Sequence, residues 1–342
     1  MSKSLGNSPD PLELIEKFGA DGVRTGMLFS SPAGNDLPFD ESLCEQGRNF
    51  SNKIWNAFRL VKGWSVEEKD QPASSAVAVK WMESRIVRAT AEIDALYAQF
   101  RISEALMTTY KLIWDDLCSW YLESIKPPFI DGIGQPIDRR TFEATIGIFE
   151  NALKLLHPFM PFLTEELWHA LRDRKAGEDI IVAQWPEGGE GDRVLETEMQ
   201  HAFELIAAVR NLRNDRGMSP KEALEVRSSG AAIMQGPVAA IAMKLANISL
   251  GEGAADTAVK FLVGTKEYAV DLGANIDPEA ERRKAIEELD YLKGFLTSVE
   301  KKLGNERFVN GAPAAVLENE RRKKADAEAK IKALEERLSQ LA

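Results

Sequence analysis

The sequence has few of the residues that build disulfides or metal sites. Its 342 residues include two cysteines, Cys44 and Cys118. No Cys-x-x-Cys pair is present, so we expect no structural zinc site and no bound metal. Each cysteine lies within a helical pattern, which is typical of a buried free thiol in a reduced, cytoplasmic protein. The three histidines are His157, His169 and His201.

Long apolar runs and an excess of positive charge are also missing. No run of about 18 apolar residues occurs, so we expect no membrane span. The net charge of −11 is opposite in sign to that of a typical nucleic-acid-binding protein. Residues 277–342 hold 14 basic and 14 acidic residues, which leaves the whole negative balance on residues 1–276. Any RNA-binding surface must therefore be local, and we expect no DNA partner.

The first seven residues combine one cation with small polar groups. Residues 1–7 contain Lys3, two serines, a glycine and an asparagine. A phosphate-binding loop needs such a set: a lysine charge for the oxygens, small hydrogen-bond donors, and glycine for close backbone approach. The alternative is a solvated tail, which is common at polar N-termini.

Helical periodicity dominates the next part of the chain. Asp10 can cap a short helix that Gly19 ends, and a second short helix is expected within 20–37. Longer amphipathic helices have apolar residues three and four positions apart. They are expected at about 40–61, 82–96, 103–120 and 138–156. Ser103 should cap the third, and Thr164 should cap a further helix. Packed antiparallel, these helices predict a mainly α fold built on a helical bundle.

The pattern becomes mixed after a glycine-rich linker at 188–192. A helix is expected at about 196–213 and another at about 238–246. β-like runs are present at 224–227, 259–263 and 268–272. These elements predict a small α+β unit.

A heptad pattern fills the last part of the chain, where core positions recur in steps of four and three. On the first helix they are Ala285, Leu289, Leu292, Leu296, Val299 and Leu303. On the second, after a first step of seven, they are Leu317, Lys324, Ala327, Ile331, Leu334, Leu338 and Leu341. Pro313 is suited to open the second helix. Two helices of about 26 residues predict an antiparallel coiled-coil hairpin.

Three stretches together resemble the class I aminoacyl-tRNA synthetases of the valine, isoleucine and leucine subgroup. They are Met1-Ser2-Lys3-Ser4, the segment from Arg48 to Arg59, and His157-Pro158-Phe159-Met160-Pro161-Phe162. In that subgroup the first stretch is written Lys-Met-Ser-Lys-Ser and contacts ATP. The chain begins at the Met of this motif, so we expect it to be the C-terminal part of a longer synthetase.

The terminal hairpin resembles the arm that ends the valine-specific members of the subgroup. The isoleucine-specific members tend to end in a cysteine-bearing metal module, which is absent here, although the same region of such an enzyme is an alternative. The resemblance implies four parts. They are an ATP loop with connecting helices at 1–38, an anticodon-binding bundle at 39–187, an α+β linker domain at 192–275, and a tRNA-binding arm at 277–342.

The resemblance also implies an activity. The longer enzyme would activate valine with ATP and Mg²⁺ and transfer it to tRNA(Val). Lys3 would be catalytic, and Met1, Ser2, Lys3 and Ser4 would form the ATP loop. We expect the chain alone to be an inactive monomer that binds no cofactor. We read His157 as a packing or capping group rather than a catalytic one.

Two sets of residues are candidates for tRNA binding. The first is Arg48, Asn52, Lys53, Trp55, Asn56 and Arg59, because cations neutralise phosphate, asparagine contacts base edges and an exposed aromatic ring stacks on a base. The alternative places Asn52, Asn56 and Trp55 inside the bundle. The second set is Arg321, Arg322, Lys323 and Lys324. Interleaved acids leave open a merely solvated coiled-coil face, or a helical module that binds protein through its coiled coil.

Overall fold

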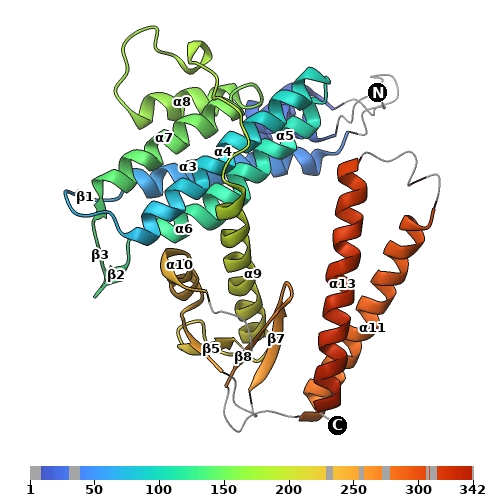
Figure 1. Cartoon of the computed structure of the whole chain (residues 1–342). Coiled ribbons are helices and arrows are strands. Elements are labelled where there is room, and N and C mark those ends of the chain that lie inside the picture. The colour runs from blue at the N-terminus through green and yellow to red at the C-terminus, as the bar shows by residue number, and fades with distance from the viewer. Residues whose placement is uncertain are drawn as a thin grey trace. The chain divides into compact units, whose positions relative to one another are not determined.

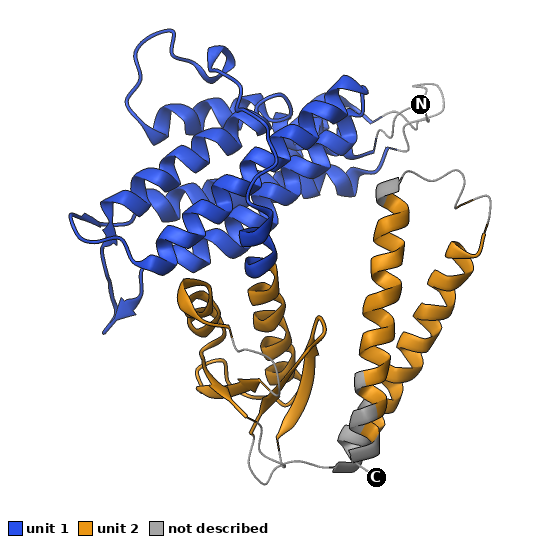
Figure 2. Ribbon diagram, viewed as in Figure 1, with its two compact units in different colours: residues 1–199 blue, residues 200–342 orange. Residues whose placement is uncertain are grey.

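The computed structural model describes residues 9–30, 39–228, 234–253, 258–271, 278–305, 308 and 314–340 (Figure 1). They fall into two compact units, residues 1–199 and 200–342 (Figure 2). The predicted ATP loop lies outside the described residues. Among the described helices, none is long and apolar enough to cross a membrane. The prediction of a mainly α fold is confirmed.

The first unit is a helical bundle with short strands at its loops. Its helices are α1 (Pro11–Phe18), α2 (Ala20–Phe29), α3 (Glu41–Lys62), α4 (Ala73–Ala98), α5 (Ile102–Lys111), η2 (Leu112–Tyr121), α6 (Leu122–Ile125), α7 (Arg139–Leu156), α8 (Pro161–Leu171) and η3 (Ile180–Val182). Its strands are β1 (Val66–Glu67), β2 (Phe129–Ile130), β3 (Ile133–Gly134) and β4 (Ile137–Asp138). The stripes predicted from periodicity face the core: Phe50, Ile54 and Val61 of α3 are at most 1% exposed.

Aspartates begin several of these helices as expected. Asp10 accepts a hydrogen bond from the Leu12 N–H, and Asp40 accepts one from the Ser42 N–H, both at 2.9 Å. Each satisfies a backbone donor that the first helical turn leaves unpaired. Hydrogen bonds from Ser42 lower the pKa of Asp40, which keeps its carboxylate charged at the start of α3.

The caps predicted at Ser103 and Thr164 are wrong. Helix α5 begins at Ile102, so Ser103 lies within its first turn. Helix α8 begins at Pro161, whose ring fixes a helical φ and lacks the N–H that a cap would satisfy. Thr164 lies one turn further on, where its hydroxyl donates to the Met160 carbonyl at 2.8 Å.

A side chain from another helix satisfies the start of α8 instead. Asp21 on α2 accepts hydrogen bonds from Leu163 N at 2.7 Å and from Phe162 N at 3.4 Å. Burial raises the pKa of Asp21, and the two backbone donors partly offset that effect. Arg24, one turn along α2, donates to the carbonyls of Pro158 and Phe159 at 3.2 Å. The proline-rich stretch therefore serves to join α2 to α8.

Helix α3 is held against α2 by a glycine contact. A Cβ atom on Gly26 would lie 2.5 Å from the Cys44 backbone nitrogen, and one on Gly47 would lie 2.5 Å from the Gly22 carbonyl oxygen. Any side chain at these positions would push the two backbones apart. The glycines therefore fix the height and rotation of α3, the helix that carries the first set of candidate residues.

A buried ionic network ties the end of this unit to α4. The carboxylate of Glu196 is 7% exposed and accepts a hydrogen bond from Ser84 Oγ at 2.6 Å. Arg85 and Arg88 both pair with it, and Arg85 also contacts Asp116 at 2.9 Å. Burial raises the pKa of Asp116, an effect that the guanidinium of Arg85 partly offsets.

The second unit contains a four-stranded sheet. Helix α9 (Arg193–Asp215) enters it from the first unit. It is followed by β5 (Leu224–Ser228), α10 (Gly236–Ala246), β6 (Ile248–Glu252), β7 (Val259–Val263) and β8 (Lys266–Val270). The strand order is β6-β5-β8-β7, in which only the β5–β6 pair is parallel. The predicted α+β unit is thus present, but the sequence pattern did not predict strand β6.

Helices α11 (Pro278–Leu303) and α13 (Ala314–Gln340) form the predicted hairpin. Leu289, Val299, Ala327 and Leu334 are buried in its seam. The pattern missed one seam position, Glu320, which is buried although it carries a carboxylate. Pro313 and Leu341 lie outside the described residues, as does the side chain of Ala285.

Candidate nucleic-acid interface

Four of the six candidates on α3 form one exposed stripe. Asn52, Trp55, Asn56 and Arg59 follow one another in steps of three, one and three, which places them on the same face of a helix. All four are exposed, with Trp55 at 37%. The alternative that placed the two asparagines and Trp55 inside the bundle is therefore wrong. The asparagine and arginine side chains make no hydrogen bond or ion pair with any described residue.

Trp55 is partly covered by the bundle and stays 37% exposed. Its ring centroid lies 5.8 Å from that of Phe58, a residue of the bundle core. The exposed part of the residue lies on the same face of α3 as Asn52 and Asn56. A ring fixed in this way is suited to stack on an unpaired base, because it loses little conformational freedom on contact.

The other two α3 candidates have partners within the bundle. Arg48 donates to the Lys17 carbonyl at 3.4 Å and lies 5.6 Å from the ring centre of Phe18, so it joins α3 to the end of α1. The ammonium of Lys53 lies 4.0 Å from the ring centre of Trp114 and 3.3 Å from Ser119 Oγ. These contacts give both cations a positioning role in α3.

Helix η2 lies beside Lys53 and holds the second cysteine. Its ten residues follow the wider π-helical winding. Burial raises the pKa of Cys118 to about 12, so this thiol stays uncharged and unreactive at neutral pH. The two cysteines are free thiols, as predicted.

The four cations of the arm also divide into two kinds. Arg321 and Arg322 are exposed, and Arg322 donates to Asn319 Oδ1 at 3.0 Å. Lys323 pairs with Glu320 at 2.6 Å. Lys324, which the heptad pattern placed in the seam, pairs with Glu300 across the hairpin at 2.9 Å. The arginines are thus available to a partner, whereas Lys323 pairs within α13 and Lys324 pairs across the hairpin.

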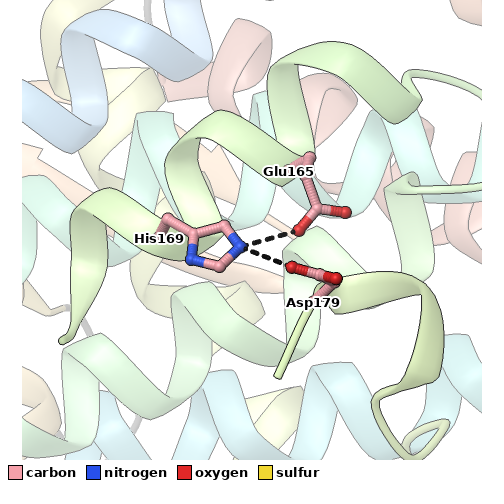
Figure 3. Close-up of side chains that lie close together, drawn as sticks. All are labelled: Glu165, His169 and Asp179. Atoms are coloured by element: carbon pink, nitrogen blue, oxygen red, sulfur yellow. Dashed lines mark hydrogen bonds and ion pairs between the residues drawn. The ribbon is translucent and has the colours of Figure 1, made fainter. Parts of the chain in front are cut away.

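Two histidines of the bundle, His157 and His169, make side-chain contacts with nearby polar groups. His157 Nδ1 and Thr164 Oγ1 share a hydrogen bond of 2.7 Å. Burial lowers the pKa of His157, which fits the predicted packing role. Glu165, His169 and Asp179 converge on one another (Figure 3), a cluster that we did not predict. The Glu-x-x-x-His spacing on α8 was a sequence signal for part of it.

Comparisons with known proteins support this picture. The anticodon-binding domain of tRNA ligase matches residues 79–228, and the valyl tRNA synthetase tRNA binding arm matches residues 277–342. Whole-chain relatives are valine–tRNA ligases from Parabacteroides distasonis at 54% identity, Christiangramia forsetii at 52% and Geobacillus stearothermophilus at 35%. The chain spans 39%, 39% and 40% of their respective lengths.

A helical bundle that matches the anticodon-binding domain, together with an exposed polar and aromatic stripe, defines a part of an aminoacyl-tRNA synthetase. Within that class, the terminal arm and the identities over the whole chain are decisive. The chain belongs to the valine–tRNA ligase family.

Proposed function

We propose that this chain is the tRNA-binding region of a valine–tRNA ligase, which activates valine with ATP and Mg²⁺ and transfers it to tRNA(Val). The observation that carries the proposal is the stripe on α3, because its polar side chains have no partner among the described residues and lie beside an exposed tryptophan. Asn52 and Asn56 would contact base edges, Arg59 a phosphate, and Trp55 a base face. The protein would act in the cytoplasm as a monomer.

We also propose that residues 1–4, which lie outside the described residues, contact ATP in the longer enzyme. Amino-acid activation displaces pyrophosphate, and negative charge builds on the phosphates in the transition state. Lys3 would stabilise that charge, while Met1, Ser2 and Ser4 would shape the loop around it. The chain alone would bind no ATP. Our four-part division at 1–38, 39–187, 192–275 and 277–342 stays a prediction.

The stripe can be tested by changing one residue at a time. Arg59→Ala should remove one phosphate contact, so tRNA(Val) affinity should fall and the slope of log affinity against log salt should drop by somewhat less than one unit.

Trp55→Ala should weaken binding by about 1–3 kcal/mol through lost stacking, and Trp55→Phe should restore part of it. Filter-binding titrations at two salt concentrations measure both effects.

The matched control for Arg59 is Arg140→Ala, which removes an exposed arginine from α7. It should leave both affinity and salt slope close to those of the parent chain. If Arg59→Ala and Arg140→Ala behave alike, the α3 stripe is not a specific RNA contact and the assignment is wrong.

The role of the arm can be tested by comparing changes at its exposed arginines with a change at Lys324, which pairs across the hairpin. Replacing Arg321 and Arg322 with alanine should lower the salt slope of tRNA binding by somewhat less than two units and leave the hairpin folded. Lys324→Ala should instead loosen the hairpin, because it removes the partner of Glu300 across the seam. Salt-dependent binding and helicity by circular dichroism distinguish the two outcomes.

Deleting residues 277–342 should weaken tRNA binding at least as much as the arginine pair does, and it should flatten the salt dependence. Equal affinity and slope with and without these residues would contradict the role. The arm would then be a protein-docking element, as the alternative function requires.

A further inference from the structure

Three ligand-type side chains meet at one end of α8, away from the α3 stripe in the sequence. Glu165 Oε1 lies 3.2 Å from His169 Nε2, and Asp179 Oδ1 lies 3.0 Å from the same nitrogen (Figure 3). The ligand atoms of all three residues lie within 4.8 Å of one another. Both carboxylates thus face a single ring nitrogen rather than opposite sides of the ring.

The polypeptide fixes this arrangement. Glu165 and His169 are one helical turn apart, so their side chains share a face of α8. Glu165 Oε1 also accepts the Ile180 N–H at 3.0 Å, which binds it to the segment that carries Asp179. The indole of Trp168 donates to the Glu178 carbonyl at 2.8 Å and anchors the same segment to α8. The three ligand atoms are therefore brought together by contacts that do not depend on His169.

The spacing of the three atoms suits a small divalent ion. Zinc binds histidine nitrogen and carboxylate oxygen at about 2.0–2.2 Å, so neighbouring ligands around one ion lie about 3.0–3.5 Å apart. The two nitrogen–oxygen distances fall in that range. A neutral imidazole with two carboxylates carries a charge of −2, which a divalent ion cancels.

The donor set favours a first-row transition ion over calcium or magnesium, because imidazole nitrogen is a poor ligand for those hard cations. The site also has room for further ligands. The side chains of Glu165, His169 and Asp179 are 34%, 42% and 49% exposed. Glu165 in addition lines an open hollow of about 520 Å³ with His157, Pro161, Phe162, Glu166 and Ile181.

We propose that Glu165, His169 and Asp179 form a binding site for one divalent transition-metal ion, which joins α8 to the segment before η3. Water would complete the coordination from the hollow. The proposal uses none of the residues assigned above to tRNA or ATP, so its test does not depend on the function proposed above.

Zinc titration of the 342-residue chain tests the proposal. Calorimetry in excess magnesium, which occupies weak carboxylate sites, should give one zinc ion per chain. Zinc should also raise the melting temperature of the chain. Glu165→Gln and Asp179→Asn should each lower zinc affinity by roughly 10- to 100-fold or more, and His169→Ala should abolish stoichiometric binding.

Glu166→Gln is the matched control, since it makes the same change one residue along α8 at a side chain outside the cluster. It should bind zinc as the parent does. Because Glu165→Gln and Asp179→Asn keep the size of the side chains, they separate ligand loss from misfolding, which circular dichroism checks. If the parent chain binds no stoichiometric zinc, or if all four variants bind it equally, the cluster is only an ion-paired histidine and the proposal is overturned.

Discussion

Replacing Lys3 with alanine is expected to slow valine-dependent ATP–pyrophosphate exchange by roughly 10²–10³-fold, the typical cost of removing one preorganised donor to a developing negative charge. The measurement uses a chain of the full length of the relatives, of which this chain spans 39–40%. The loss should appear in kcat, since a charge that develops in the transition state is stabilised there more than in the ground state. Valine binding should hardly change.

Lys17→Ala provides the control for Lys3. Lys17 is an exposed lysine at the end of α1 and pairs with Glu41 at 3.1 Å. Its removal should leave exchange unchanged, because such exposed pairs contribute little. Unaltered exchange in the Lys3 variant would remove this residue from the mechanism and favour the solvated-tail reading of residues 1–7.

Replacing Glu196 with alanine is expected to destabilise the first unit by about 2–4 kcal/mol. The change leaves Arg85 and Arg88 without their shared carboxylate in a half-buried place, and breaking such an ionic group commonly costs about 3–5 kcal/mol. We expect the lower part of that range or slightly less, because both guanidinium groups keep some contact with water. Urea unfolding followed by circular dichroism measures the loss.

The control for Glu196 lies two residues further along α9. Glu198 is exposed and has no partner in the network, so Glu198→Ala should change the unfolding free energy by no more than about 0.5 kcal/mol. Equal behaviour of the two variants would mean that the network contributes no net stability. Buried ion pairs give that outcome when the cost of their desolvation cancels their attraction.

The elements that periodicity predicts well are those whose stripe is long. The seams of α3 and of the terminal hairpin repeat over five or more turns. Among their predicted residues, Phe50, Ile54 and Val61 of α3 and Leu289, Val299, Ala327 and Leu334 of the hairpin are buried. Strand β6 was not predicted because Ile248–Glu252 contains a glycine and follows Asn247, which adopts a left-handed conformation. The π-helical winding of η2 also gives no signal, since residues three and four apart still look amphipathic.

The candidate site was predictable in kind but not in detail. Exposed Asn52, Asn56 and Arg59 followed from the face opposite the apolar stripe. The sequence could not separate them from Arg48 and Lys53, because the partners of those two come from α1 and η2, far along the chain. The Glu165–His169–Asp179 cluster was missed for the same reason, since Asp179 joins it only through a loop.

The polar layer of the hairpin has a consequence for how the arm finds its pairing during folding. A seam made only of leucine and alanine fits almost as well when one helix slides by seven residues. Here such a slide would carry Lys324 from Glu300 to Lys293, and two positive charges would meet where an ion pair belongs. Glu320 would leave Lys302 for the apolar neighbourhood of Phe295. The charged residues thus specify the register of the hairpin: they destabilise misaligned pairings and favour a single alignment of the two helices.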